Sequence, residues 1–159
     1  MDDKDRQIIA ALQRNGRLSN QDLSEQVHLS PSPCLRRLRQ LEDDGIIRGY
    51  TALVDEEAYG LPVTVFVRVR LQVHDKESVR AFEAAILNMD AVLDCYVMTG
   101  NTDYLLRVLV ENLKHYEEFV RKQLHTAPCV ASIDTSFAYG RVKQASVFAP
   151  PRMLENRKK

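Results

Sequence analysis

Every odd-numbered residue from Val63 to Val73 is apolar, and this alternation is the strongest structural constraint in the chain. Side chains of a β-strand point alternately to opposite faces, so a period of two predicts one long strand whose odd residues are buried. The even-numbered residues are Thr64, Phe66, Arg68, Arg70 and Gln72. The second face of this strand is therefore only partly apolar.

The segments that follow alternate between helix and strand patterns. Helical spacing over 78–88 precedes strand patterns over 92–99 and 104–110, Asn112 opens a second helix, and residues 130–142 form a last strand. The order strand-helix-strand-strand-helix-strand predicts a ferredoxin-like βαββαβ domain, with two helices on one face of an antiparallel sheet. The open face of that sheet, with Phe66, Tyr96 and Met98, is free either to pack against a second copy or to stay in solvent.

Three helical segments precede this domain. Residues 2–15 have amphipathic spacing, Ser19 is the expected N-cap of a helix that ends near Val27, and a third helix runs from the capping residue Ser30 to Gly45. Only His28 and Leu29 separate the second helix from the third, which leaves room for a tight turn alone. The pattern predicts a helix-turn-helix unit, followed by a β-rich segment over 46–54 that we expect to form a short strand or wing.

The third helix carries Arg36, Arg37 and Arg39, and no acidic residue occurs among them before Glu42. Such a run also suits an ordinary solvated helix face, and Arg39 could lie along the edge of the core. The helix-turn-helix context favours a nucleic-acid interface, because the second helix of that motif presents side chains to base edges in the major groove. The candidate DNA-binding residues are Ser19, Asn20, Gln21, Ser30, Ser32, Arg36, Arg37 and Arg39.

An acidic segment with Gly and Pro, residues 55–62, separates the two periodicities and is the expected linker. We therefore expect an α+β chain with a helix-turn-helix domain over 1–54, a second domain over 63–150 and a basic tail over 151–159. The 22 basic and 22 acidic residues give no net charge, which argues against indiscriminate coating of nucleic acid. No apolar run approaches the ~20 residues of a membrane span, and the start is unlike a signal peptide, so we expect a cytoplasmic protein.

The cysteines Cys34, Cys95 and Cys129 are far apart and form no Cys-x-x-Cys motif. We expect buried, reduced thiols and no metal site. The sequence also contains no Ser-His-acid or Cys-His constellation, phosphate-cradling loop or dinucleotide fingerprint. An enzyme and a bound cofactor are therefore not expected.

Five ordered blocks resemble the leucine-responsive regulatory protein (Lrp)/AsnC family of bacterial and archaeal transcription regulators. They are Asp5-x-x-Ile8-Ile9, the segment from Leu29 to Leu38, Leu41-Glu42-x-x-Gly45-Ile46-Ile47-x-Gly49-Tyr50, Gly100-x-x-Asp103-Tyr104, and Val130…Thr135…Val142-Lys143. The resemblance implies a domain that binds double-stranded DNA and a second domain that binds an effector, mostly an amino acid, and forms homodimers and commonly octamers. It further implies control of genes for amino-acid metabolism or transport.

Residues 100–103 are, on composition alone, an ordinary hairpin turn. The match to the family's Gly-x-x-Asp-Tyr block implies instead an effector site, where Asp103 would receive an α-ammonium group. The implied effector-binding residues are Gly100, Asn101, Thr102, Asp103, Tyr104, Thr135 and Ser136. The chain departs from the family pattern at Cys129, where glycine is usual.

One alternative function remains within the DNA-binding class. An architectural protein would compact DNA with little sequence preference and no obligatory effector. Steep salt dependence without preference for an operator would identify it.

Overall fold

In the computed structural model, residues 1–144 and 147 are described. The chain divides into two compact units, one built on Met1–Leu53 and the other on Val54–Val142. No helix of the described part is long and apolar enough to cross a lipid bilayer. The expected basic tail, residues 151–159, lies outside the described residues.

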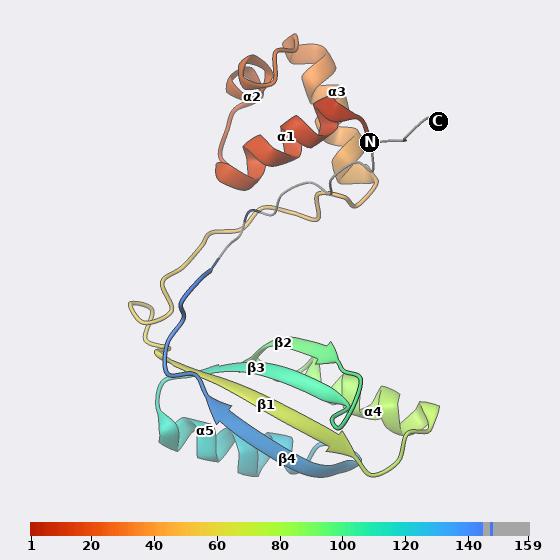
Figure 1. Cartoon of the computed structure of the whole chain (residues 1–159), viewed down its shortest axis with the longest axis vertical. Coiled ribbons are helices and arrows are strands. Elements are labelled where there is room, and N and C mark those ends of the chain that lie inside the picture. The colour runs from red at the N-terminus through yellow and green to blue at the C-terminus, as the bar shows by residue number, and fades with distance from the viewer. Residues whose placement is uncertain (145–146, 148–159) are drawn as a thin grey trace, which may run out of the picture. The chain divides into compact units, whose positions relative to one another are not determined.

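The N-terminal unit consists of three helices, α1 (Asp3–Arg14), α2 (Asn20–Gln26) and α3 (Pro31–Asp43), as Figure 1 shows. Capping boxes begin the first two helices, with Asp2 and Asp5 on α1 and Ser19 and Asp22 on α2. The three helices share one small apolar core, formed by Ile8, Ala11, Leu23, Val27, Cys34 and Leu41. The predicted helix-turn-helix unit is confirmed.

A Schellman motif ends both α2 and α3. At the end of α2, the N–H of Leu29 donates to the carbonyl of Ser24 (2.9 Å), and His28 has a left-handed φ of 52°. At the end of α3, Gly45 takes the same role with a φ of 68°. Glycine adopts this conformation without strain, whereas His28 does not, so the turn between α2 and α3 contains a strained residue.

The predicted ends of α3 are confirmed, but a capping hydrogen bond at Ser30 and a strand over 46–54 do not form. Ser30 is the N-cap, but its hydroxyl makes no capping hydrogen bond. A capping oxygen accepts from the N–H of the second or third helical residue, and the third is Pro33, which has no N–H. The segment 46–54 forms no strand, since no other described segment pairs with it.

The C-terminal unit has the predicted βαββαβ order. Its elements are β1 (Val63–Leu71), α4 (Lys76–Ile86), β2 (Val92–Val97), β3 (Tyr104–Val110), α5 (Leu113–Phe119), the π-helical turn η1 (Val120–Leu124) and β4 (Val130–Phe137). The strand order is β2-β3-β1-β4, and all neighbours are antiparallel. Both α4 and α5 cover the same face of the sheet (Figure 1).

The alternation in β1 produces the core as predicted. Val65, Val67 and Val69 are fully buried between the sheet and the helices, together with Phe82 of α4 and Leu124 of η1. No helix of the described residues covers the opposite face of the sheet (Figure 1). With the exception of Phe66, the apolar residues of β1 therefore lie on the face that α4 and α5 cover, and its polar residues lie on the opposite face.

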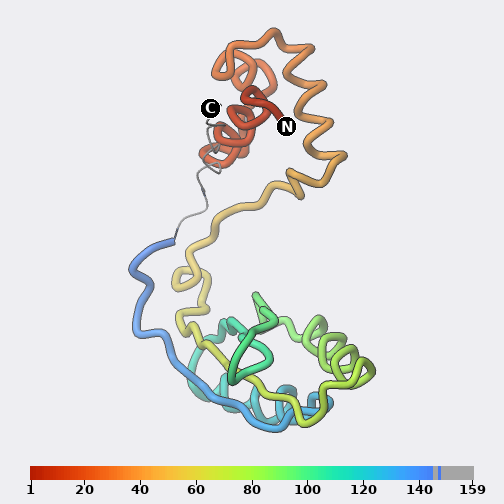
Figure 2. The backbone as a smooth tube through the Cα atoms, turned by 45° about the vertical axis from the view of Figure 1, so that its right-hand side comes forward, coloured from red at the N-terminus to blue at the C-terminus, as the bar shows by residue number. Residues whose placement is uncertain are grey.

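The central strand β1 pairs with the last strand β4, so the chain enters and leaves the unit at one end of the sheet (Figure 2). Val65 is opposite Phe137, and the N–H of Ala138 donates to the carbonyl of Thr64 (2.9 Å). The predicted strand over 130–142 is therefore too long, because β1 offers no further partner residues beyond this point.

The three thiols are free but differ in exposure. Cys34 is buried, and burial raises the pKa of its thiol. Cys95 is exposed and Cys129 is half-buried, so the expectation of buried thiols is wrong for these two. Within residues 1–144 and 147, no group of three or more His, Cys, Asp or Glu side chains could hold a metal ion.

Candidate DNA-binding and effector sites

The outer side of α3 presents four of the predicted DNA-binding side chains to solvent. Ser30 and Ser32 are exposed at its N-terminus, and Arg36 and Arg39 are exposed further along. Arg39 does not lie along the core edge. This part of α3 therefore combines hydroxyl groups with two guanidinium groups, which suits contacts with phosphates and base edges.

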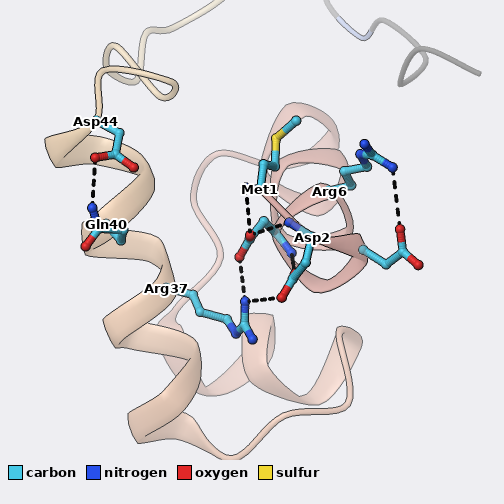
Figure 3. A network of polar contacts seen from close by, with 8 residues as sticks. Met1, Asp2, Arg6, Arg37, Gln40 and Asp44 are labelled. Atoms are coloured by element: carbon cyan, nitrogen blue, oxygen red, sulfur yellow. Dashed lines mark hydrogen bonds and ion pairs between the residues drawn. The ribbon is translucent and has the colours of Figure 1, made fainter. Parts of the chain in front are cut away.

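Arg37 points instead toward α1 (Figure 3). Its Nη1 lies 2.8 Å from a carboxylate oxygen of Asp2 and 2.8 Å from one of Asp5. Hydrogen bonds to Asp5 and Asp2 raise the pKa of the Arg37 guanidinium, and the N–H of Asp5 helps to lower the pKa of Asp2. We call these three residues the Arg37 cluster.

Ser19, Asn20 and Gln21 at the start of α2 each make a hydrogen bond inside the domain, although the buried side-chain oxygen of Asn20 has no partner among the described residues. The Ser19 hydroxyl accepts from the N–H of Asp22 (3.1 Å) and lies 2.7 Å from its carboxylate. The Asn20 amide donates to the carbonyl of Pro31 (2.9 Å), and the Gln21 amide donates to Glu25 (2.7 Å). Asn20 thereby connects the first turns of α2 and α3.

The acidic run at the end of α3 has structural partners that the sequence did not predict. The Tyr50 hydroxyl donates to Glu42 (2.8 Å), and Gln40 donates to Asp44 (2.8 Å). Burial and the Glu42 carboxylate raise the pKa of Tyr50 to about 12. Glu42 thus holds the segment that follows α3.

The predicted effector loop is the hairpin between β2 and β3. Gly100 has a φ of 102°, which an L side chain rarely adopts. Asp103 closes the hairpin, because its carbonyl accepts from the N–H of Met98 (2.8 Å) and its own N–H donates to Val69 of β1 (2.9 Å). Gly100, Asn101, Thr102 and Asp103 therefore lie together beside the end of β1.

The Asp103 carboxylate is fixed by two donors. One oxygen accepts from the N–H of Leu71 (2.7 Å), and the other lies 2.9 Å from the imidazole of His74. The Leu71 N–H lowers the pKa of Asp103, and His74 and Arg70 lower it further. The side chain remains 27% exposed. The site is an ionised, preorganised and accessible carboxylate.

The structure does not bring the other predicted effector residues to this carboxylate. The Tyr104 side chain packs against Phe82 (4.7 Å between ring centroids) and donates to Glu83 (3.0 Å) on the helix side of the sheet. Thr135 lies opposite Val67 and bonds to Tyr116 (2.6 Å) on that same side.

Ser136 is on the open face, where its hydroxyl accepts from Arg68 (3.1 Å). Its partner across the ladder is Phe66, five positions along β1 from Leu71. At about 3.3 Å per residue, these five steps place Ser136 roughly 16 Å along the strand from the Asp103 end. Within one chain, Ser136 is therefore not part of the hairpin site.

Comparison with known proteins decides the family. Residues 1–48 match the winged helix-turn-helix DNA-binding domain, and residues 64–148 match the Lrp/AsnC ligand binding domain. The chain belongs to the Lrp/AsnC family. It is thus a DNA-binding transcription regulator of the Lrp/AsnC type with a ligand-binding domain.

This Lrp/AsnC regulator is similar over nearly its whole length to characterised relatives. It is 40% identical over 143 residues to the DNA-binding transcriptional activator DecR of Escherichia coli (strain K12), covering 90% of this chain and 94% of that one. It is 41% identical over 151 residues to the Bkd operon transcriptional regulator of Pseudomonas aeruginosa, covering 95% and 97%. A transcriptional regulator of Neisseria meningitidis, solved as its L-Met complex, superposes with a TM-score of 0.88 at 40% identity, covering 94% and 96%.

Sequence reasoning missed two sets of residues in this Lrp/AsnC regulator. His74 was not predicted as a partner of Asp103, and Asp2 and Asp5 were not predicted as partners of Arg37. The first pair is 29 residues apart, and Arg37 is 35 and 32 residues from the two acids. The only local signal was the run of acidic residues at the start of α1, which also suits the helix dipole.

Proposed function

We propose that this regulator binds specific operators through α3, and that a free amino acid bound at the β2–β3 hairpin changes its assembly and its operator affinity. The observation that carries the effector part is the Asp103 carboxylate, which is ionised, fixed by Leu71 and partly exposed. A fixed carboxylate is a strong acceptor for the α-ammonium group of an amino acid.

The existing partners of Asp103 leave it able to accept further hydrogen bonds. A carboxylate offers about four lone-pair positions, and the Leu71 N–H and His74 use one on each oxygen. Gly100, Asn101 and Thr102 lie in the same hairpin and supply backbone and side-chain polar groups. The L-Met complex of the similar Neisseria meningitidis regulator supports an amino-acid effector.

On the DNA side, the proposed contacts are the exposed groups of α3. Arg36 and Arg39 carry the charge, and Ser30 and Ser32 supply hydroxyl groups near the helix N-terminus. Ser19, Asn20 and Gln21 belong to this proposal less directly, because each has a partner within the domain. The proposed targets are genes of amino-acid metabolism or transport, and the proposed place of action is the cytoplasm.

Assembly follows from the open face of the sheet. Phe66 and Leu105 are half-buried there and Tyr96 is 54% exposed, while the Arg68 and Arg107 charges are paired with Asp134 (3.3 Å) and Asp94 (2.5 Å). A partly apolar face on which Arg68 and Arg107 are paired with carboxylates favours packing against a second copy. Homodimers through this face, assembled further up to octamers, are the proposed form.

Ligand control requires that the effector bind two assembly states with different affinity, since equal affinity shifts no equilibrium. A coupling free energy of about 1–3 kcal/mol would change operator affinity about 5- to 150-fold. That range suffices for a metabolic switch.

The test is a titration of the full chain with labelled DNA from upstream of its own gene, repeated with each of the twenty amino acids at millimolar concentration. Fluorescence anisotropy gives the operator affinity, and light scattering gives the assembly size. We expect one amino acid to change both. Asp103→Asn abolishes this response, whereas Asp90→Asn, an exposed site after α4, leaves it intact.

Two results would contradict the proposal. Specific DNA binding that no amino acid affects would remove Asp103 from an effector site. Equal affinity for all DNA sequences, with a steep salt dependence, would identify an architectural protein instead.

A further inference from the structure

The Arg37 cluster joins the first turn of α1 to the middle of α3. We propose that Arg37 is a positioning residue and not a DNA contact, and that Asp2 and Asp5 hold α3 in the orientation from which its exposed side chains read DNA. This inference rests on the proposed DNA binding by α3. The first turn of α1 then contributes to DNA recognition indirectly, by fixing the orientation of α3.

The capping box of α1 fixes the carboxylates of Asp2 and Asp5 independently of Arg37. In the capping box of α1, one oxygen of Asp2 accepts from the N–H of Asp5 (3.0 Å), and one oxygen of Asp5 accepts from the N–H of Asp2 (2.7 Å). The other oxygen of each residue accepts from Arg37 (2.8 Å each, Figure 3). Each carboxylate thus divides its two oxygens between the cap and the guanidinium.

This arrangement differs from an ordinary surface ion pair. The Asp5 side chain is only 14% exposed, and the Arg37 side chain is 32% exposed. By contrast, the nearby pair of Asp3 and Arg6 joins residues of one helix at 3.5 Å, with Asp3 78% exposed. Of these two sets of ion pairs, the Arg37 cluster is the one that joins α1 to α3, so it constrains the angle between these helices in addition to their shared apolar core.

The local charge also argues against a phosphate contact by Arg37. The Arg37 guanidinium is paired with two carboxylates, and the Met1 ammonium lies 4.0 Å from Asp5, so this group has no surplus positive charge to attract a DNA phosphate. Arg36 is one residue earlier and is rotated by about 100° around the helix. It is exposed and makes the better DNA contact.

Two further hydrogen bonds join α2 to the other two helices of this unit. The Lys4 ammonium donates to the carbonyl of Val27 at the end of α2 (2.6 Å), and Asn20 donates to Pro31 at the start of α3 (2.9 Å). With the Arg37 cluster, these contacts connect each pair of helices at one point. Loss of the cluster leaves α3 held near its first turn and by the core alone.

The experiment compares Arg37→Met with Arg36→Met in the full chain. Anisotropy titrations over a salt series use the DNA upstream of the chain's own gene and a random-sequence duplex of equal length. We expect Arg36→Met to lower the salt slope by about one, as for a lost phosphate contact. We expect Arg37→Met to keep the slope and to lower the ratio of operator to random affinity at least about fivefold, as when one base contact is lost.

Matched variants separate positioning from loss of charge or of stability. Asp5→Asn and Asp3→Asn remove the same charge from the same turn, and only Asp5→Asn is expected to lower the affinity ratio. Ile8→Val weakens the core without touching the cluster and should leave the ratio unchanged. Arg37→Lys keeps a cation for the two carboxylates, so it should lower the ratio of operator to random affinity less than Arg37→Met does.

The inference fails if Arg37→Met lowers the salt slope by about one with an unchanged ratio, or if Asp3→Asn or Ile8→Val lowers the ratio as much as Asp5→Asn. If the unmodified chain shows no preference for the upstream DNA, the proposed operator binding has failed on its own. The salt slopes then decide the role of Arg37, since a positioning residue leaves the slope unchanged.

Discussion

The two units of the chain are stabilised in different ways. In the described residues, six buried apolar residues form the core of the N-terminal unit and fifteen form that of the C-terminal unit. The small unit adds two capping boxes and the directional contacts of Lys4, Asn20 and Arg37. A domain near the lower size limit for independent folding gains in this way both stability and fixed helix angles.

The difference teaches that polar contacts define geometry where the core is too small to do so. The proposed reading of DNA by α3 requires this helix at a defined angle, and hydrogen bonds are more directional than apolar packing. In the C-terminal unit, the continuous apolar core between the sheet and its helices is large enough to fix the geometry. The comparison predicts large effects from core truncation in one unit and measurable effects from single caps in the other.

The largest expected effect comes from the core of the C-terminal unit. Phe82 is fully buried against Tyr104, so Phe82→Ala should lower the free energy of unfolding by about 3–5 kcal/mol. Urea denaturation followed by circular dichroism measures the change. Leu87→Ala is the control, because Leu87 is 88% exposed. A loss below about 1 kcal/mol at Phe82 would mean that this core is not the main source of stability.

The caps of the N-terminal unit give the next largest effect. Ser19→Ala removes a capping hydrogen bond and should cost about 1 kcal/mol of unfolding free energy. Ser30 occupies the same helical position on α3 without such a bond, so Ser30→Ala should cost much less. Thermal denaturation of both variants tests this, and equal losses would contradict the assignment of the caps.

A smaller effect, of opposite sign, is expected from the strained residues. His28 (φ 52°) and Cys129 (φ 60°) are left-handed, one in each unit. Relief of about 1–2 kcal/mol of strain, less about 0.5–1 kcal/mol for the flexibility of glycine, predicts that His28→Gly and Cys129→Gly each stabilise by up to about 1 kcal/mol. Denaturant unfolding measures both, and His28→Ala, which keeps the strain, should not stabilise.

The smallest expected effect is on the free energy of unfolding at acidic pH. Hydrogen bonds from backbone N–H groups lower the pKa of Asp2 and of Asp75, the N-caps of α1 and α4. A lowered folded pKa adds stability above the unfolded value of about 3.9, and this stability is lost as the pH falls through the folded pKa. Asp75→Asn keeps a capping oxygen that does not titrate, so it should flatten the pH dependence of unfolding below pH 4.

Asp2→Asn provides the matching test in the other unit. It also weakens the pairing with Arg37, so it should reduce stability at neutral pH as well. Unfolding followed from pH 3 to pH 7 distinguishes the two variants. If Asp75→Asn lowers the free energy of unfolding at neutral pH as much as Asp2→Asn does, the Arg37 cluster has no additional role in stability.

Short-range patterns predicted most of the fold. The alternation in β1 correctly predicted its buried face, and cap and glycine signals predicted the ends of α2 and α3. These signals work because period and capping involve residues within a few positions of each other. For residues 46–54 the sequence predicted a short strand or wing, and no strand forms there, because a β-rich composition does not supply a pairing partner.

The candidate sites were less predictable, because their contacts join residues that are far apart in the sequence. The sequence predicted the Asp103 hairpin through a local block, but not that His74 approaches its carboxylate. Adjacent residues of a strand point to opposite faces, so Thr135 and Ser136 could not both face one site, but the distance of Ser136 from the Asp103 end followed only from the register of β4 against β1. The acidic partners of Arg37 were missed because they are 35 and 32 residues away in the sequence.

The pairing of β1 with β4 has a consequence for how such regulators diverge. Both connections of the C-terminal domain leave at the end of β1 where Val63 lies, and the Asp103 hairpin is at the other end, about 26 Å away along the strand. Sequence joined to either terminus therefore starts far from the hairpin. Recombination that exchanges the attached segments can alter operator choice while the sensing chemistry is inherited unchanged.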